Sequence, residues 1–62
     1  MVPDAGSVVR QWVKRKEQHA DAVRRAAQTE PNPDMQRGMR EGAEETVRQA
    51  RRIEDWFRQR FR

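Results

Sequence analysis

The sequence predicts an all-α fold, an antiparallel two-helix hairpin, and three observations support that prediction. Apolar residues recur at helical spacing through two long stretches of the 62-residue chain. A segment with two prolines (residues 30–34, EPNPD) separates these stretches. The connection is short, so the two helices are expected to fold back on one another. We expect a single domain over residues 1–62 that completes a helical bundle by self-association or by docking on a partner.

The first helix is expected over about residues 5–28. The helix is expected to start after Asp4 or after Ser7, because both residue types favour the N-cap position. The helix has to end before Pro31, because the residue that precedes a proline is pushed out of the α region of backbone space. Residues 29–32 are therefore expected to form a turn.

The second helix is expected over about residues 33–61. Asn32 is a favoured N-cap residue, Pro33 suits the first helical position, and Asp34 is attracted by the positive end of the helix dipole. The last turn of this stretch is rich in arginine, whose charge suits the negative end of the helix. The start of this helix at Asn32, Pro33 and Asp34 is the strongest local signal in the chain.

An α-helix turns by about 100° per residue, so the positions of the apolar residues predict which stripe of each helix is buried. In the first helix the expected stripe consists of Ala5, Val9, Trp12, Ala20, Val23 and Ala27, flanked by Val8 and His19 on one side and by Val13 on the other. In the second helix it consists of Met35, Met39, Ala43, Thr46, Ala50, Ile53, Phe57 and Phe61. Lys16 falls near the middle of the first stripe. It either extends its stem along the core and keeps its ammonium in water, or it sets the register of an interface.

The composition limits how much apolar surface such a hairpin can bury. The chain is 39% charged, and it contains no leucine, one isoleucine and seven alanines. Two helices cannot surround a large side chain, so a lone hairpin of this length is expected to be under-stabilised. Trp56 lies about 100° away from the stripe of the second helix, where a single neighbouring helix leaves it exposed. We expect the missing burial to come from a second copy, as a four-helix dimer, or from a larger protein.

The large apolar side chains gather at the end of the hairpin that lies opposite the turn. This aromatic end, the expected protein interface, consists of Val9, Trp12, Ile53, Trp56, Phe57 and Phe61. Aromatic clusters of this kind dominate the energetics of protein interfaces. The sequence therefore favours a small accessory, regulatory or adaptor protein whose partner is a second copy, a larger protein, or both.

The alternative function is nucleic-acid binding by the arginine-rich C-terminal helix. Arginine supplies 12 of the 14 basic residues, and its planar guanidinium suits both phosphate groups and aromatic rings. The candidate nucleic-acid contacts are Arg10, Arg15, Arg52, Arg60 and Arg62. Codon usage in a GC-rich genome explains the same arginine bias equally well. The charge is polarised, because residues 29–45 carry two basic and five acidic groups whereas residues 46–62 carry six basic and two acidic groups.

Ion pairs between residues four positions apart are expected to neutralise part of this charge. The expected pairs are Glu44–Arg48, Glu54–Arg58, Asp21–Arg25 and Arg51–Asp55. A net charge of +4 is modest for a dedicated DNA-binding protein, and the chain carries no helix-turn-helix, zinc-finger or RNA-binding signature. The salt dependence of binding separates the two functions, because phosphate contacts weaken steeply with salt.

Neither catalysis nor a cofactor nor a metal is expected. The chain has no cysteine, and each of its three hydroxyl residues has a structural role available. His19 is the single histidine, and Glu41 or Glu45 is expected roughly across the hairpin from it. The Glu-x-x-His spacing of di-iron bundles is nevertheless absent. We therefore expect His19 to be an ordinary residue at the flank of the stripe.

The chain contains no apolar stretch long enough for a transmembrane span and no pattern typical of a signal peptide. An arginine-rich amphipathic helix can lie on an anionic membrane surface, but the aromatic end is better explained as a protein interface. A cytoplasmic location is the expectation that follows.

Overall fold

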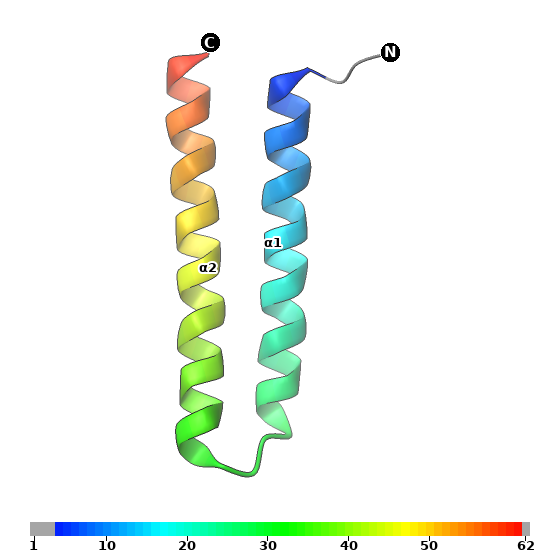
Figure 1. Cartoon of the computed structure of the whole chain (residues 1–62), viewed down its shortest axis with the longest axis vertical. Coiled ribbons are helices and arrows are strands. Elements are labelled where there is room, and N and C mark those ends of the chain that lie inside the picture. The colour runs from blue at the N-terminus through cyan, green and yellow to red at the C-terminus, as the bar shows by residue number, and fades with distance from the viewer. Residues whose placement is uncertain (1–3, 62) are drawn as a thin grey trace.

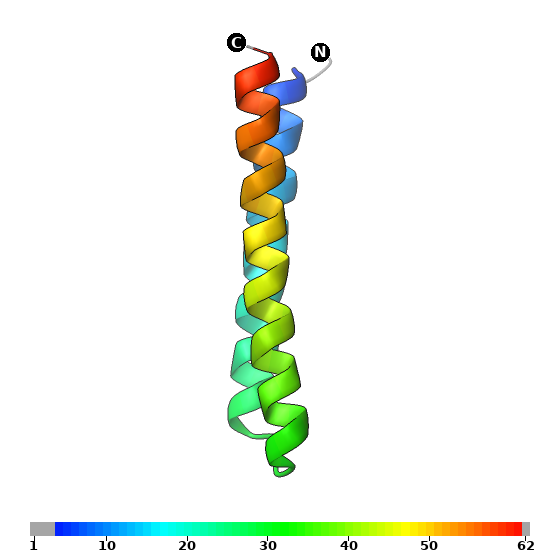
Figure 2. The same ribbon diagram turned by 90° about the vertical axis from the view of Figure 1, so that its left-hand side faces the viewer.

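The computed structural model describes residues 4–61, which form two helices joined by a short turn (Figure 1). Helix α1 spans Ala5–Gln28 and helix α2 spans Pro33–Arg60. The helices are antiparallel and pack against each other, and the turned view shows α2 in front of α1 along its length (Figure 2). Two helices that lie side by side form a flat slab with two broad faces. The predicted all-α hairpin is confirmed.

Hydrogen bonds fix both ends of α1. The Asp4 Oδ1 atom accepts a hydrogen bond from the backbone N–H of Ser7 at 2.7 Å, so Asp4 is the N-cap of the two candidates. Thr29 is the C-cap, and both its backbone N–H and its hydroxyl donate to the carbonyl of Ala26, at 3.2 and 3.1 Å. These contacts satisfy backbone groups that a helix end otherwise leaves without a partner.

The predicted start of α2 is confirmed. The Asn32 Oδ1 atom accepts hydrogen bonds from the backbone N–H groups of Asp34 and Met35, at 2.9 and 3.2 Å, and the expected proline occupies the first helical position. At the other end α2 stops at Arg60 with Phe61 as its C-cap, one residue before the expected end. The local sequence of the turn therefore predicted correctly where α2 begins.

The contact between the helices is a seam of small residues at seven-residue spacing. The buried residues are Val13, Ala20 and Ala27 on α1, and Ala43 and Ala50 on α2. Residues that face each other across the seam have numbers that add up to 63. Ala20 is thus opposite Ala43, and Val13 is opposite Ala50.

Contacts at the two ends of the seam establish this register. Near the turn, the Gln36 Nε2 atom donates to the carbonyl of Ala27 at 2.8 Å. At the opposite end, a Cβ atom placed on Gly6 would lie 3.9 Å from the ring of Phe57. The seam therefore runs from the turn to the aromatic end in a single register.

The position of the seam shows that the predicted stripes were partly wrong. Val13, expected at a flank, is buried, whereas Met35, Ile53 and Phe61, expected within the stripe of α2, are exposed. Ala5 is likewise exposed. Two helices touch along a narrow line, where small side chains allow the backbones to approach and large ones have room only at the sides. The alanines therefore form the contact and the larger residues lie beside it.

The ion pairs lie on the exposed sides of the helices and also differ in part from the prediction. Of the four expected pairs, Glu54–Arg58 is present at 3.5 Å. Four residues of the other expected pairs have different partners, in the pairs Asp21–Arg24, Glu45–Arg48, Glu17–Arg51 and Asp55–Arg58. Exposed pairs of this kind contribute little to stability, so the choice of partner leaves the fold unchanged.

Candidate interaction surface

One broad face of the slab, here called the apolar face, carries two rows of mainly uncharged residues that flank the seam on the same side. The row on α1 consists of Val9, Trp12, Lys16, His19 and Val23, and the row on α2 of Met35, Met39, Gly42, Thr46, Gln49, Ile53, Trp56 and Arg60. Within each row the residues alternate at spacings of three and four, which keeps them on one side of a helix. His19 of the first row lines the same hollow as Met39 and Gly42 of the second. The two rows therefore share one face.

Lys16 and Arg60 are the two cationic residues in these rows, and each lies over a tryptophan of the same face. The Lys16 Nζ atom is 5.7 Å from the ring centroid of Trp12, and the guanidinium carbon of Arg60 is 5.6 Å from that of Trp56. The electron-rich face of an indole ring attracts a cation at such distances. Both cations are thus accommodated without an acidic partner on the apolar face.

The opposite broad face is charged. Glu17 of α1 and Arg51 of α2 bridge the two helices on that side, with Oε1 and Nε 3.6 Å apart. Arg58 lies between two acidic groups, at 3.5 Å from Glu54 and 3.8 Å from Asp55. None of the ion pairs found within residues 4–61 involves a residue of the apolar face. The whole hairpin, and not only each helix, is therefore amphipathic.

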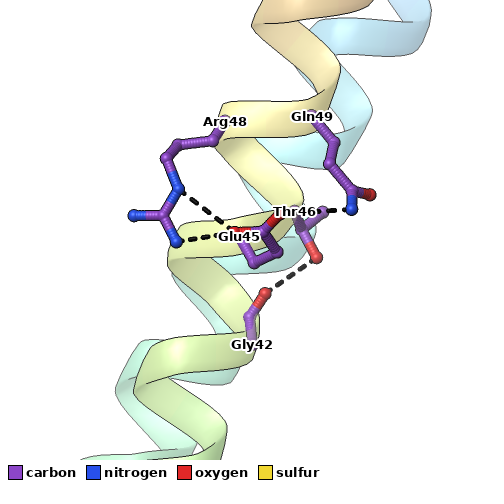
Figure 3. A network of polar contacts seen from close by, with 5 residues as sticks. All are labelled: Gly42, Glu45, Thr46, Arg48 and Gln49. Carbon is purple, nitrogen blue, oxygen red and sulfur yellow. Dashed lines mark hydrogen bonds and ion pairs between the residues drawn. The ribbon is translucent and has the colours of Figure 1, made fainter.

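Glu45 lies at the outer edge of α2 and accepts the largest number of side-chain hydrogen bonds shown in Figure 3. Its Oε2 atom accepts from Nε and Nη2 of Arg48, at 3.2 and 2.6 Å, and its Oε1 atom accepts from Nε2 of Gln49 at 3.2 Å. The hydrogen bonds from Arg48, together with its positive charge, lower the pKa of the Glu45 carboxyl. The Thr46 hydroxyl donates to the carbonyl of Gly42 at 2.9 Å, so its hydrogen-bonding capacity is used within α2.

Arg48→Gln is expected to remove a small, pH-dependent part of the stability. Because the folded state lowers the pKa of Glu45, ionised Glu45 stabilises the fold above its ordinary pKa of 4.5, and this contribution is lost as the pH falls through the lower native value. The free energy of unfolding of R48Q should be below that of the wild type at pH 7 and equal to it at about pH 2. Urea unfolding at both pH values measures the difference. Arg15→Gln, at an exposed position, is the control, and an equal loss for R48Q at both pH values would contradict the prediction.

The structure leaves much of the predicted interface uncovered. Ile53, Trp56 and Phe61 remain 47%, 55% and 62% exposed. The other three residues of the aromatic end, Val9, Trp12 and Phe57, are half-buried. The structure thus brings the predicted residues to one end of the hairpin without burying them.

Three aromatic rings at this end contact one another. Phe57 and Phe61 stack with their ring centroids 4.8 Å apart, and Phe61 meets Trp56 edge to face at 6.3 Å. Phe57 also closes the seam against Gly6, as described above. Phe57 thus lies against α1 and Phe61 links it to Trp56, so the three rings order one another.

A shallow hollow of about 260 Å³ lies on the apolar face nearer the turn. This tip hollow is lined by His19, Ala20, Val23, Gly38, Met39, Gly42, Ala43 and Thr46. A Cβ atom placed on Gly38 or Gly42 would meet no atom within 4 Å, so the two glycines recess the surface of α2. The hollow was not predicted. Its signal in the sequence was the four-residue spacing of the two glycines, which puts them on one side of the helix.

The candidate nucleic-acid contacts do not gather in one patch. Arg15 and Arg52 each follow a buried residue by two positions, about 200° around the helix. They therefore point away from the seam at opposite edges of the slab. Arg10 lines a second, smaller hollow at the aromatic end, and Arg60 lies over a tryptophan of the apolar face. Arg62 lies outside the described residues.

His19 is exposed at the rim of the tip hollow, and the Glu45 carboxylate proposed opposite it is already bound by Arg48. Within residues 4–61, no three histidine or acidic side chains are grouped closely enough to hold a metal ion. Neither α1 nor α2 contains a segment sufficiently long and apolar to cross a bilayer. Comparisons of the chain with protein-family models, with curated proteins and with solved structures find no match.

Proposed function

We propose that this chain is a non-enzymatic protein–protein interaction module, a small accessory or adaptor protein of the cytoplasm that binds through its aromatic end. The observation that carries the proposal is the exposure of Ile53, Trp56 and Phe61, three large apolar side chains at one end of the hairpin. A monomeric protein seldom exposes a contiguous apolar patch unless the patch is an interaction site. Aromatic residues at the centre of such a patch supply most of the binding free energy.

The distribution of arginine supports a protein partner over nucleic acid. Phosphate binding along a nucleic-acid backbone requires cations that line one surface. Arg15 and Arg52 lie at opposite edges of the slab, and Arg48, Arg51 and Arg58 are paired with carboxylates. A partner with apolar side chains matches the exposed surface more closely.

The test is the solution mass of the chain over a range of concentrations at about 0.05 and 0.5 M NaCl. We expect the mass to rise above the 7.4 kDa of one chain as the concentration increases. The dissociation constant should change little between the two salt concentrations, because burial of apolar surface depends weakly on ionic strength. A parallel titration uses a single-stranded DNA oligonucleotide and a DNA duplex. A chain that stays monomeric and binds DNA with a steep loss of affinity in salt would overturn the proposal.

A further inference from the structure

Building on that proposed function, we propose that the partner is a second copy of this chain, packed apolar face to apolar face with its ends reversed. In this arrangement the turn of each hairpin lies beside the aromatic end of the other. The two helices of each copy then contribute to a four-helix bundle. Three properties of the apolar face point to this occupant and this orientation: its area, its relief and the charge of its two halves.

The area of the face suits a stable dimer. Two helices of this length lying side by side, about 40 Å long and about 20 Å across with their side chains, present a broad face of roughly 800 Å². A specific protein interface of ordinary size buries about 800 Å² on each partner. Face-to-face packing of two copies can therefore cover the exposed aromatic end and still leave the charged faces in water.

The projecting side chains and the hollow of the apolar face fit those of a second copy only when the ends are reversed. Ile53 and Trp56 project at one end of the face and Met35 projects at the turn, while the tip hollow lies between Met35 and the middle of the face. The two-fold axis of this dimer lies in the interface near Thr46 and is perpendicular to the helices. Residue 53 of one copy is then at the level of residue 39 of the other. The projecting side chains of each copy then meet the hollow of its partner, as a two-fold interface requires. Packing in the same direction would place the two hollows against each other and leave a void.

The charge distribution favours the same orientation. Residues 4–16 and 46–61, which form the half at the aromatic end, carry nine basic and three acidic groups. Residues 17–45, which form the half at the turn, carry four basic and seven acidic groups. Reversed ends place the basic half of each copy beside the acidic half of the other, whereas packing in the same direction places like charges together. Such complementarity selects an orientation more than it adds affinity.

Lys16 fits this arrangement although it lies near the proposed two-fold axis. Its ammonium lies over Trp12, four residues earlier in α1, so the side chain extends toward the aromatic end. In a dimer with reversed ends the two Lys16 side chains therefore extend in opposite directions, away from the axis. Their charges are separated, and each covers an indole ring of its own copy.

Cysteine cross-linking measures the orientation directly, because the natural chain contains no cysteine. Ile53→Cys and Met39→Cys are mixed in equal amounts and oxidised, and the disulfide products are identified by mass. Reversed ends bring positions 53 and 39 of different copies together, so the mixed disulfide should exceed the half expected from random pairing. Val9→Cys mixed with Ile53→Cys reports the opposite orientation, because packing in the same direction lays α1 of one copy over α2 of the other at that level.

Gly42→Leu tests whether the tip hollow receives the partner. A Cβ atom at Gly42 meets no atom of its own chain, and leucine favours helix more than glycine does, so the hairpin itself should gain stability. The filled hollow should nevertheless raise the dissociation constant of the dimer at least tenfold in sedimentation equilibrium. Ala22→Leu, at an exposed position outside the apolar face, is the matched control and should leave the dissociation constant unchanged.

Each outcome of these experiments decides the proposal. An excess of the mixed 39–53 disulfide together with weaker association of Gly42→Leu supports it. An excess of the 9–53 disulfide, or an unchanged dissociation constant for Gly42→Leu, overturns it. The proposed function survives that result if Trp56→Ala still weakens association. A chain that is monomeric, yet binds vesicles of phosphatidylcholine and phosphatidylglycerol, shows that a membrane surface and not a second copy covers the apolar face.

Discussion

Ala43→Leu is expected to lower the free energy of unfolding by about 1–3 kcal/mol, although leucine is larger, more apolar and nearly as good a helix former as alanine. The reason is the position of Ala43 in the seam, directly opposite Ala20, with both residues buried. Carbon atoms added between the two backbones overlap the other helix, and only the tip hollow beside Ala43 offers room, away from the seam. The helices must separate or the new side chain must adopt a strained rotamer.

Thermal unfolding followed by circular dichroism, at one fixed protein concentration, measures this effect. A loss of that size corresponds to a drop of roughly 5–20 °C in Tm for a domain of this length. Ala22→Leu makes the same chemical change at an exposed position and should stay within about 0.5 kcal/mol of the wild type. A higher Tm for Ala43→Leu than for the control would show that the seam contains unfilled space.

Trp56→Ala is expected to weaken association of the chain by more than about 1 kcal/mol while leaving the helices intact. The indole ring is 55% exposed in the hairpin, so its removal creates no large cavity there. In the complex the same ring is expected to be covered by the partner. Its loss also removes the surface over which Arg60 lies and the edge-to-face contact with Phe61.

Sedimentation equilibrium gives the dissociation constant, and circular dichroism verifies that helical content is retained. Trp56→Phe keeps an aromatic ring at the position and should retain most of the affinity. Glu44→Ala, at an exposed position outside the apolar face, should behave as the wild type does. Equal dissociation constants for Trp56→Ala and the wild type would remove Trp56 from the interface.

The helices and their connection could be predicted because local chemistry determines them. Asn32 has to lie outside the helix to accept hydrogen bonds from the first turn, and the neighbouring prolines are incompatible with a continuous helix. Asp4 acts in the same way at the start of α1. These signals depend on a few neighbouring residues, so they can be read without knowledge of the packing.

The buried stripes could be predicted only in part, because hydrophobicity and burial do not coincide in a two-helix contact. A count of large apolar residues places Ile53 and Met35 inside, yet both are exposed. Val13, which the same reasoning places at the flank of the stripe, is buried in the seam. Burial is decided by the width of the side chain that fits between the two backbones. This width depends on the register of both helices together.

The ion pairs show a second limit of the sequence. Arg48 has Glu44 four positions before it and Glu45 three positions before it, and both spacings bring side chains together on a helix. The structure selects Glu45, with the two nearest atoms 2.6 Å apart. The partner of Arg51 is further away in the sequence, since it is Glu17 of the other helix. Pairs across the hairpin require the register, which local spacing does not contain.

The rule that facing residues of the seam have numbers adding up to 63 also restricts how the hairpin can change in length. A single residue inserted between Val13 and Ala20 turns one part of α1 by about 100° relative to the other. Part of the charged face would then rotate into the seam. Seven residues added to one arm alone keep the rotation but leave a stretch of α1 or α2 without a helix beside it. A longer or shorter hairpin of this design therefore differs by two seven-residue blocks, one in each arm, placed at the same level.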